Sequence, residues 1–324
     1  NSNYGTCVVG TVSGETISFG SEIVFLSANA TYITLEFNPN TTNQFVITFA
    51  DNGSSGSFTA IIGTRSGASL SFSSKFVINS GATYYGQFAF DPSTTNQFLT
   101  VYRDAGNSDY GTARVGLISG SSISYGAEAV FSSSATNEES VSSDPNTARQ
   151  FVIGYKVGSP MYALVATTTV SNTVSFGAAA TISTNGYTGN SSFDTNTANK
   201  FVFSYSDGAN SYYGTAKAAT ISGTTITLGT ASIINSGTTY QTIISYSNLS
   251  PSVFSIAYQD RSNSDNIGLR SGTTSGTTIT LGAADILHTG GAGSSGEAAF
   301  SLPFSSGGKF CLAYANSISS NAGT

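Results

Sequence analysis

Residues 107–115 read NSDYGTARV, and residues 1–9 read NSNYGTCVV, which is nearly the same segment 106 residues earlier. A segment that recurs at a fixed period is the sequence signature of a repeat architecture. Phenylalanines recur here at steps of 53, 53, 50, 53 and 56 residues, at Phe45, Phe98, Phe151, Phe201, Phe254 and Phe310. An aromatic residue four positions later keeps the same steps. The sequence therefore predicts a repeated unit of about 53 residues.

Each unit resolves into four short runs rich in Val, Ile, Thr, Phe and Tyr, separated by turn residues, which is the pattern of β-strands. In the second unit, the run at 97–104 leads through AGNS into the run at 109–119. Such short connections predict antiparallel hairpins. The links between units, NSGAT at 79–83 and NSGTT at 235–239, are predicted to be looser.

Ser-Gly turns close the last hairpin of most units. Gly14, Gly223 and Gly276 occupy these turns, where a positive φ is expected and glycine adopts it without strain. These glycines are predicted to be structural.

Repeated four-stranded antiparallel units of this length are typical of β-propeller blades. We predict an all-β, six-bladed β-propeller that forms one domain over residues 1–324. The first and last segments, 1–26 and 296–324, each supply half a blade and are predicted to close the ring as a two-plus-two clasp. The alternative is an open β-solenoid, whose coils are usually much shorter. The five complete blades are predicted at about 32–78, 84–131, 137–182, 187–234 and 239–287.

The two cysteines lie in the two half-blades. Cys7 aligns with Ala113 of the second unit, and Cys311 aligns with Leu99. A hairpin centred near Gly106 places Leu99 opposite Ala113, at a separation close to that of a disulfide. The sequence therefore predicts a Cys7–Cys311 bond, and two unrelated buried thiols are the alternative.

Composition argues against two classes of partner. The net charge is −6, the isoelectric point is about 4.6, and no cluster of Lys and Arg appears, so nucleic acid is not an expected partner. No apolar run approaches the roughly 18 residues of a membrane-spanning helix, so membrane insertion is not expected either. A hydrophobic content of 39% is enough for a folded core.

Residues that could carry catalysis are sparse. His288 is the only histidine, and Glu138 and Glu139 form the only adjacent pair of acids. A lone histidine without a repeated partner is more often incidental than catalytic, and no G-x-S-x-G elbow precedes a helix. Carboxylates from separate blades leave glycoside cleavage open. The prediction from these observations is that the chain is not an enzyme.

Three hairpin loops repeat an acidic pattern: DAGNSDY at 104–110, DGANSYY at 207–213 and DRSNSDN at 260–266. Oxygen atoms of Asp and Asn at close spacing are ligands that Ca²⁺ accepts. The spacing is not that of an EF-hand, and Asx residues in tight loops usually bond their own backbone. We predict no cofactor and no metal site, with Ca²⁺ as the alternative.

The same loops, together with the links between units, are predicted to lie at one end of the blades. Aromatic faces beside amides and carboxylates suit sugar rings, which need apolar contact and hydrogen bonds. Tyrosines that only cap strand ends are the alternative. The candidate ligand-binding residues are Tyr84, Asp104, Asn107, Tyr187, Asp207, Asn210 and Tyr240.

The GNSxYGTA and SGTxIxxG segments resemble tandem repeats of marine phage virion proteins and bacterial surface proteins. The resemblance covers the whole chain, implies an extracellular or virion-surface propeller, and brings no catalytic residues with it. The function predicted is a binding or adhesion module, lectin-like, whose partner is a glycan or a cell-surface receptor. The alternative is a structural surface or appendage protein that packs against identical or neighbouring subunits.

Overall fold

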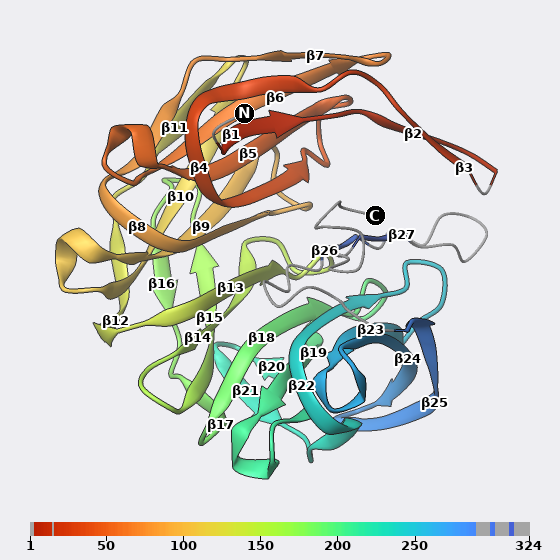
Figure 1. Ribbon diagram of the computed structural model, residues 1–324. Coiled ribbons are helices and arrows are strands. Elements are labelled where there is room, and N and C mark those ends of the chain that lie inside the picture. The colour runs from red at the N-terminus through yellow and green to blue at the C-terminus, as the bar shows by residue number, and fades with distance from the viewer. Residues whose placement is uncertain (1–2, 15, 290–298, 302–310, 314–324) are drawn as a thin grey trace. The chain divides into compact units, whose positions relative to one another are not determined.

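A computed structural model describes residues 3–14, 16–289, 299–301 and 311–313, with side chains up to residue 289 (Figure 1). The described residues are 69% strand and 4% helix, arranged in several antiparallel sheets. This confirms the prediction of an all-β chain of antiparallel sheets. In the described part of the chain, no helix is long and apolar enough to cross a membrane.

The chain divides into two compact units, Asn1–Glu139 with Thr168–Val174, and Ser140–Thr167 with Ser175–Thr324. That residues 1–324 form one domain stays a prediction.

In the first unit the strands follow one another as antiparallel neighbours, in the order β1-β4-β5-β6-β8-β9-β10-β11. β7 pairs with the last residues of β6, and β12 pairs with the first residues of β10. β2 pairs with β3. The strands are β1 (Tyr4–Cys7), β2 (Gly10–Ser13), β3 (Thr16–Phe19), β4 (Ile23–Phe37), β5 (Gln44–Asp51), β6 (Ser57–Ser66), β7 (Ser69–Phe72), β8 (Phe76–Phe90), β9 (Gln97–Asp104), β10 (Tyr110–Ser119), β11 (Ser122–Tyr125) and β12 (Ala129–Ala135).

The later strands repeat this scheme in sheets of order β13-β14-β15-β16 and β18-β19-β20-β22-β23-β24-β25, with β17 on β15 and β21 on β20. β26 (Ala299–Ser301) pairs with β27 (Cys311–Ala313). The strands are β13 (Asn137–Ser143), β14 (Gln150–Lys156), β15 (Met161–Thr168), β16 (Val174–Phe176), β17 (Ala180–Ser183), β18 (Gly186–Phe193), β19 (Lys200–Asp207), β20 (Tyr213–Ser222), β21 (Thr225–Leu228), β22 (Ser232–Tyr246), β23 (Val253–Asp260), β24 (Asn266–Ser275) and β25 (Thr278–His288).

The repeated phenylalanines form the core of these sheets. Each lies near the start of the second strand of its repeat, where alternation turns it toward the neighbouring sheet. Burial of each ring stabilises the fold by about 1.5–3 kcal/mol. The exposed fractions of Phe45, Phe98, Phe151, Phe201 and Phe254 are 2, 0, 0, 0 and 0%.

The turn glycines behave as predicted. The φ angles of Gly14, Gly223 and Gly276 are 62°, 60° and 58°. This left-handed region is open to glycine without the clash that a Cβ causes.

The predicted loose links are instead parts of continuous strands. β8 and β22 are each 15 residues long and run through the links at 79–83 and 235–239. The start of β8 pairs with β6, and its end pairs with β9. One strand can serve two hairpins because a bulge bends it between Tyr84 and Gln87.

The register of β9 and β10 differs from the prediction by two residues. Ala113 pairs with Val101, and Leu99 pairs with Val115. The expectation that Leu99 faces Ala113 is therefore wrong. The reason is the one-turn 3-10 helix η2 (Ala105–Asn107), which moves the centre of the hairpin by one residue. The side chain of Cys311 lies outside the described residues, so the Cys7–Cys311 bond stays a prediction.

Candidate functional site

Each of the three predicted tyrosines lies against a cationic side chain. Tyr84 lies on β8, Tyr187 on β18 and Tyr240 on β22. A cation over the face of an aromatic ring is attracted by the ring quadrupole and fixes the position of the ring. The Cζ atoms of Arg103 and Arg261 lie 5.2 and 3.9 Å from the ring centres of Tyr84 and Tyr240, and Lys156 Nζ lies 3.3 Å from that of Tyr187.

Arg103 is held in place by two hydrogen bonds. Its Nε donates to Asp109 Oδ1 at 2.8 Å, and its Nη1 donates to Asn137 Oδ1 at 2.7 Å. The hydrogen bond from Arg103 lowers the pKa of Asp109 and keeps this carboxylate ionised. We call Tyr84, Arg103 and Asp109 the Tyr84 site.

A second site has the same composition. Arg261 Nε lies 3.8 Å from Asp265 Oδ1, and Gln259 Nε2 donates to the same oxygen at 3.2 Å. Asp109 and Asp265 hold the same position in their loops, with φ angles of 61° and 57°. We call Tyr240, Arg261 and Asp265 the Tyr240 site.

Tyr187 has a different environment. Tyr212, with a φ of 60°, takes the loop position that Asp109 and Asp265 hold elsewhere. The rings of Tyr187 and Tyr212 lie 5.5 Å apart at 41°. Tyr187 is thus packed between a ring and the amine of Lys156, which is 8% exposed, and no carboxylate takes the loop position.

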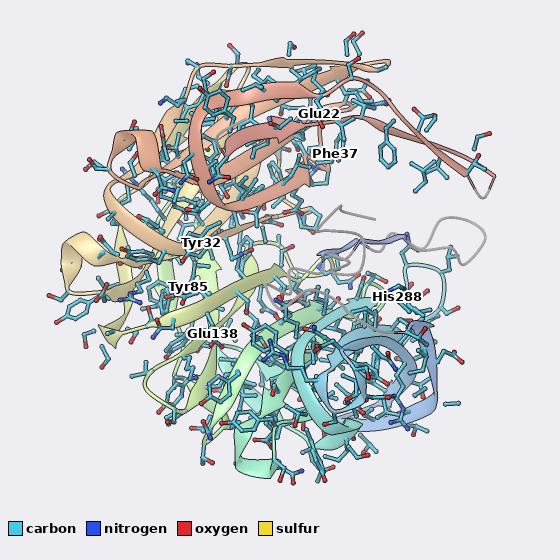
Figure 2. The ribbon with its side chains drawn as sticks, viewed as in Figure 1. Glu22, Tyr32, Phe37, Tyr85, Glu138 and His288 are labelled. Atoms are coloured by element: carbon cyan, nitrogen blue, oxygen red, sulfur yellow. The ribbon has the colours of Figure 1, made fainter. Side chains whose placement is uncertain are left out.

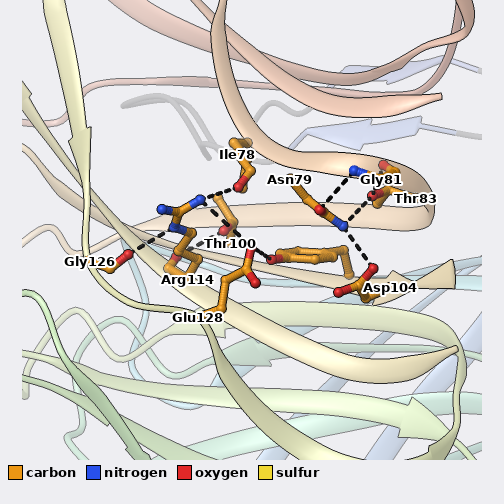
Figure 3. Close-up of polar contacts among 10 residues, drawn as sticks. Ile78, Asn79, Gly81, Thr83, Thr100, Asp104, Arg114, Gly126 and Glu128 are labelled. Carbon is orange, nitrogen blue, oxygen red and sulfur yellow. Dashed lines mark hydrogen bonds and ion pairs between the residues drawn. The ribbon is translucent and has the colours of Figure 1, made fainter. Parts of the chain in front are cut away.

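The predicted aspartates Asp104 and Asp207 support the loops. Asp104 is 6% exposed, and its Oδ1 accepts a hydrogen bond from the Gly106 amide at 3.0 Å. The same oxygen accepts a hydrogen bond from Asn79 Nδ2 at 3.0 Å (Figure 3). Asp207 accepts from the Ala209 amide at 3.3 Å and from Ser183 Oγ at 2.8 Å. Both residues are the N-caps of one-turn 3-10 helices, which is a structural use of the carboxylate.

The predicted asparagines end those same helices. Asn107 is the last residue of η2, and Asn210 is the last residue of η3 (Gly208–Asn210). Both are exposed. Among the described residues, no group of three or more His, Cys, Asp and Glu is placed to hold a metal ion. His288 is the half-buried last residue of β25 and pairs with Ile267 (Figure 2).

Sequence reasoning selected the first aspartate of each loop, whereas the second aspartate belongs to the site. The signal was present in two of the three loops. In both DAGNSDY and DRSNSDN, a Ser-Asp pair directly precedes the first residue of the next strand. The arginines do not share one position. Arg103 precedes the first aspartate of its loop, and Arg261 follows it. A search for periodic residues therefore could not pair them.

Cations on the third strand of several repeats instead reach backbone carbonyls that lie 35 or 36 residues earlier in the chain. Arg114 Nε donates to the Gly126 carbonyl at 2.8 Å, and Arg114 Nη1 donates to the Ile78 carbonyl (Figure 3). Lys217 and Arg270 reach the carbonyls of Ile182 and Ile234 at 2.7 and 2.8 Å. These side chains support the fold and are not part of the two sites.

No protein-family model and no curated protein sequence matches this chain. Solved structures share its fold. AofleA from Arthrobotrys oligospora has a TM-score of 0.55 at 9% identity, over 88% of this chain and 79% of that one. A second AofleA structure, with a TM-score of 0.55 and 10% identity, has alanine in place of three arginines spaced 53 residues apart.

Two further structures have similar scores. A candidate 6-phosphogluconolactonase from Bacteroides uniformis has a TM-score of 0.60 at 11% identity, over 99% of this chain and 95% of that one. Sqt1 from Saccharomyces cerevisiae has a TM-score of 0.56 at 9% identity, over 97% of this chain and 76% of that one. Identities this low show the fold alone.

The prediction that the chain is not an enzyme is corrected by this comparison. A candidate 6-phosphogluconolactonase shares the fold over nearly the whole chain, so the fold gives no ground for excluding catalysis. The prediction depended on the lone histidine, the single adjacent pair of acids and the missing nucleophile elbow. These are absences of particular motifs, and one fold can host many different chemistries.

Proposed function

We propose that this chain binds carbohydrate, and that the Tyr84 site and the Tyr240 site each hold a sugar ring. The single observation that carries the proposal is the repetition of tyrosine, arginine and aspartate at two places. The two tyrosines are 40% and 38% exposed. An exposed aromatic face offers contact to the C–H face of a sugar.

The polar groups favour a neutral sugar. In each site the arginine offers N–H donors and the aspartate offers acceptors, which matches hydroxyl groups that both donate and accept. The positive and negative charges cancel within each site.

For the finer architecture we propose six blades, closed by pairing of residues 1–26 with residues 296–324. The strand register supports this closure. Ala299 pairs with Ala313, and Gln87 pairs with Val101. The two pairs are equivalent, because each residue of the second pair lies 212 positions before its counterpart in the first. The exposure of Phe37 supports this closure as well, because an apolar side chain at the edge of a blade needs a further strand to cover it. Phe37 is 53% exposed, whereas Phe90 and Phe193 at the same position of later repeats are 1% and 3% exposed.

The location that the proposal implies is extracellular or on a virion surface, with a glycan or a receptor as partner. This part depends on the resemblance of the GNSxYGTA and SGTxIxxG segments alone. A structural role is the second candidate, and the exposed apolar side chains between Tyr4 and Phe37 favour it. A protein that uses this face for assembly would form oligomers, and a closed propeller would stay monomeric.

The experiment is a glycan array followed by titration with the best ligand. Tyr84→Ala and Tyr240→Ala should each weaken binding by about 1 kcal/mol or more, and the double variant should abolish it. Val170→Ala is the matched control, since Val170 is 79% exposed on a turn that contacts Gln97 at the start of β9, whereas Arg103 lies near the end of that strand. If the double variant binds as tightly as the parent, the proposal is wrong.

A further inference from the structure

The arginine of the Tyr84 site is committed to the protein. Arg103 donates from Nε to Asp109 Oδ1 at 2.8 Å and from Nη1 to Asn137 Oδ1 at 2.7 Å. Its Cζ lies 5.2 Å from the ring centre of Tyr84, which is farther than a direct stack on the ring allows. Two of the three guanidinium nitrogens of Arg103 therefore already donate to protein oxygens.

The arginine of the Tyr240 site makes no such hydrogen bonds. Within the described part of the chain, Arg261 has two contacts. Its Nε lies 3.8 Å from Asp265 Oδ1, and its Cζ lies 3.9 Å from the ring centre of Tyr240. The first distance is too long for a hydrogen bond, and the second is that of a guanidinium stacked on a ring. The side chain of Arg261 is 39% exposed, so its N–H groups are open to a ligand.

Asp265 places an acceptor beside this arginine. Its Oδ1 accepts a hydrogen bond from Gln259 Nε2 at 3.2 Å, which orients the carboxylate. Among the described residues, no donor is bonded to Oδ2 of Asp265, and the side chain is 39% exposed. The Tyr240 site therefore presents both open donors and an open acceptor to a ligand.

The side chains next to the two tyrosines differ as well. The Tyr84 ring has the Tyr32 ring beside it, with the centres 6.2 Å apart at 85°. The equivalent residue, 52 positions before Tyr240, is Thr188, whose Oγ1 donates to the Tyr240 carbonyl at 2.5 Å. With a threonine in place of a second ring, polar groups carry more of the recognition at the Tyr240 site.

On the basis of the proposed function, we propose that the Tyr240 site recognises two adjacent hydroxyl groups of a neutral sugar and that Arg261 determines this specificity. The N–H groups of a guanidinium form a planar fork, which can donate to two neighbouring oxygen atoms at once. Adjacent sugar hydroxyls are such a pair, and their protons can be donated to Asp265. The Tyr84 site, whose arginine holds protein oxygens, contributes mainly contact with the aromatic ring. The Tyr240 site is thus the tighter and the more selective of the two.

A carboxylate on an acidic sugar is the other group that a guanidinium fork binds well. Asp265 argues against it. The carboxylate of Asp265 lies 3.8 Å from Arg261 Nε, and it would repel an anion held by the same guanidinium. A pair of neutral hydroxyl groups meets no such repulsion.

The test separates the two sites by substitution, because Tyr84→Ala leaves the Tyr240 site and Tyr240→Ala leaves the Tyr84 site. The probes are the methyl α-glycosides of D-glucose, D-mannose and D-galactose, each with its 3-deoxy derivative. The derivative has no two ring hydroxyls on adjacent carbon atoms. Titration calorimetry of Tyr84→Ala should find a sugar that binds about tenfold more tightly than its 3-deoxy derivative. In Tyr240→Ala the same ratio should be about threefold or less.

Arg261→Lys keeps the positive charge but lacks the planar fork. Added to Tyr84→Ala, it should weaken binding of the preferred sugar about tenfold and remove the preference over the 3-deoxy derivative. Because Arg261 is exposed and donates no hydrogen bond to the described residues, this variant should fold as the parent does. Arg65→Lys is the matched control. Arg65 donates to Asn43 Oδ1 at 2.8 Å, outside both sites, so the control should not change sugar binding.

Equal binding of a sugar and its 3-deoxy derivative in Tyr84→Ala would overturn this inference and leave the proposed function standing. Tighter binding of methyl α-D-galacturonoside than of the methyl galactoside would overturn it too, because the fork would then hold a carboxylate. Full affinity in Arg261→Lys would show that Arg261 does not determine the specificity. Absence of binding of every glycoside in both single-site variants would contradict the proposed function as well.

Discussion

Asn79 Nδ2 donates a hydrogen bond to Asp104 Oδ1 at 3.0 Å, and both side chains are buried. Asn79 lies within β8, and Asp104 ends β9, so this bond joins the strand that crosses between repeats to the hairpin loop beside it. Asn79 also holds Gly81 and Thr83, which precede Tyr84 on the same strand. The bond therefore positions the Tyr84 site without touching the ligand.

From this bond we expect Asp104→Ala to lower the free energy of unfolding by about 1–3 kcal/mol, because it removes a helix cap and leaves Asn79 Nδ2 with Thr83 Oγ1 but without its carboxylate acceptor. Asp104→Asn retains an acceptor oxygen and should lower the free energy of unfolding by less than Asp104→Ala does. Urea denaturation measures both changes. A stable Asp104→Ala variant that loses sugar affinity would instead place Asp104 in the ligand contact.

Much of the fold could be predicted because the repeat is encoded locally. Phe98 and its periodic equivalents mark the core, and Gly223 marks a turn that only a positive φ closes. The register was missed because η2 shifts the hairpin centre by one residue. Nothing in the composition of AGNS distinguishes a simple turn from one with a 3-10 helix.

The candidate site was predicted in part. Periodicity located Tyr84 and Tyr240, because both follow the Ser-Gly link at a constant distance. It could not assign a role to Asp109 or Arg103, since a hydrogen bond between neighbouring strand ends depends on side-chain direction. Glu139 was noted only as one of an acidic pair, and its 4% exposure depends on tertiary packing that the pair itself does not reveal.

The pairing of Phe58 with Gly86 predicts an effect on packing. A Cβ at Gly86 would lie 2.4 Å from the Phe58 ring, which is fully buried. We expect Gly86→Ala to lower the free energy of unfolding by about 1–3 kcal/mol. Gly20→Ala is the control, because the nearest atom to its Cβ would be 3.6 Å away. Adding Phe58→Leu to Gly86→Ala should restore part of the loss. Additive losses in the double variant would contradict this explanation.

The register also bears on the cysteines. If the closing half-blade keeps the register of β9 and β10, Cys7 faces Ala313 and Cys311 faces Val9, so the cysteines are diagonal neighbours at about 7–8 Å. That separation exceeds the reach of a disulfide. We therefore expect a Cys7–Cys311 bond only if the closing blade shifts its register by two residues. Mass spectrometry of unreduced peptides decides between the two registers. Native Cys7 should alkylate slowly if free, because burial raises its pKa to about 11.

The last prediction concerns stability and pH. Burial raises the pKa of Glu139 to about 7 in the folded chain, whereas an unfolded glutamate titrates near 4.3. The folded state therefore holds the proton more tightly, and the stability from the neutral acid is fully present below about pH 4.3. It is lost as the pH rises through about 7, by about 4 kcal/mol in total.

Urea denaturation at about pH 5 and about pH 8 measures this difference. Glu139→Gln cannot ionise and should remove most of the pH dependence, while Glu138→Gln removes a charge at the half-buried neighbouring position and serves as the matched control. Burial also raises the pKa of Glu36 to about 7. The free energy of unfolding of Glu139→Gln should therefore still fall as the pH rises, by a smaller amount. This remaining pH dependence should disappear when Glu36→Gln is added. A parent protein that becomes more stable between these two pH values would show that Glu139 is ionised and partnered in the folded chain.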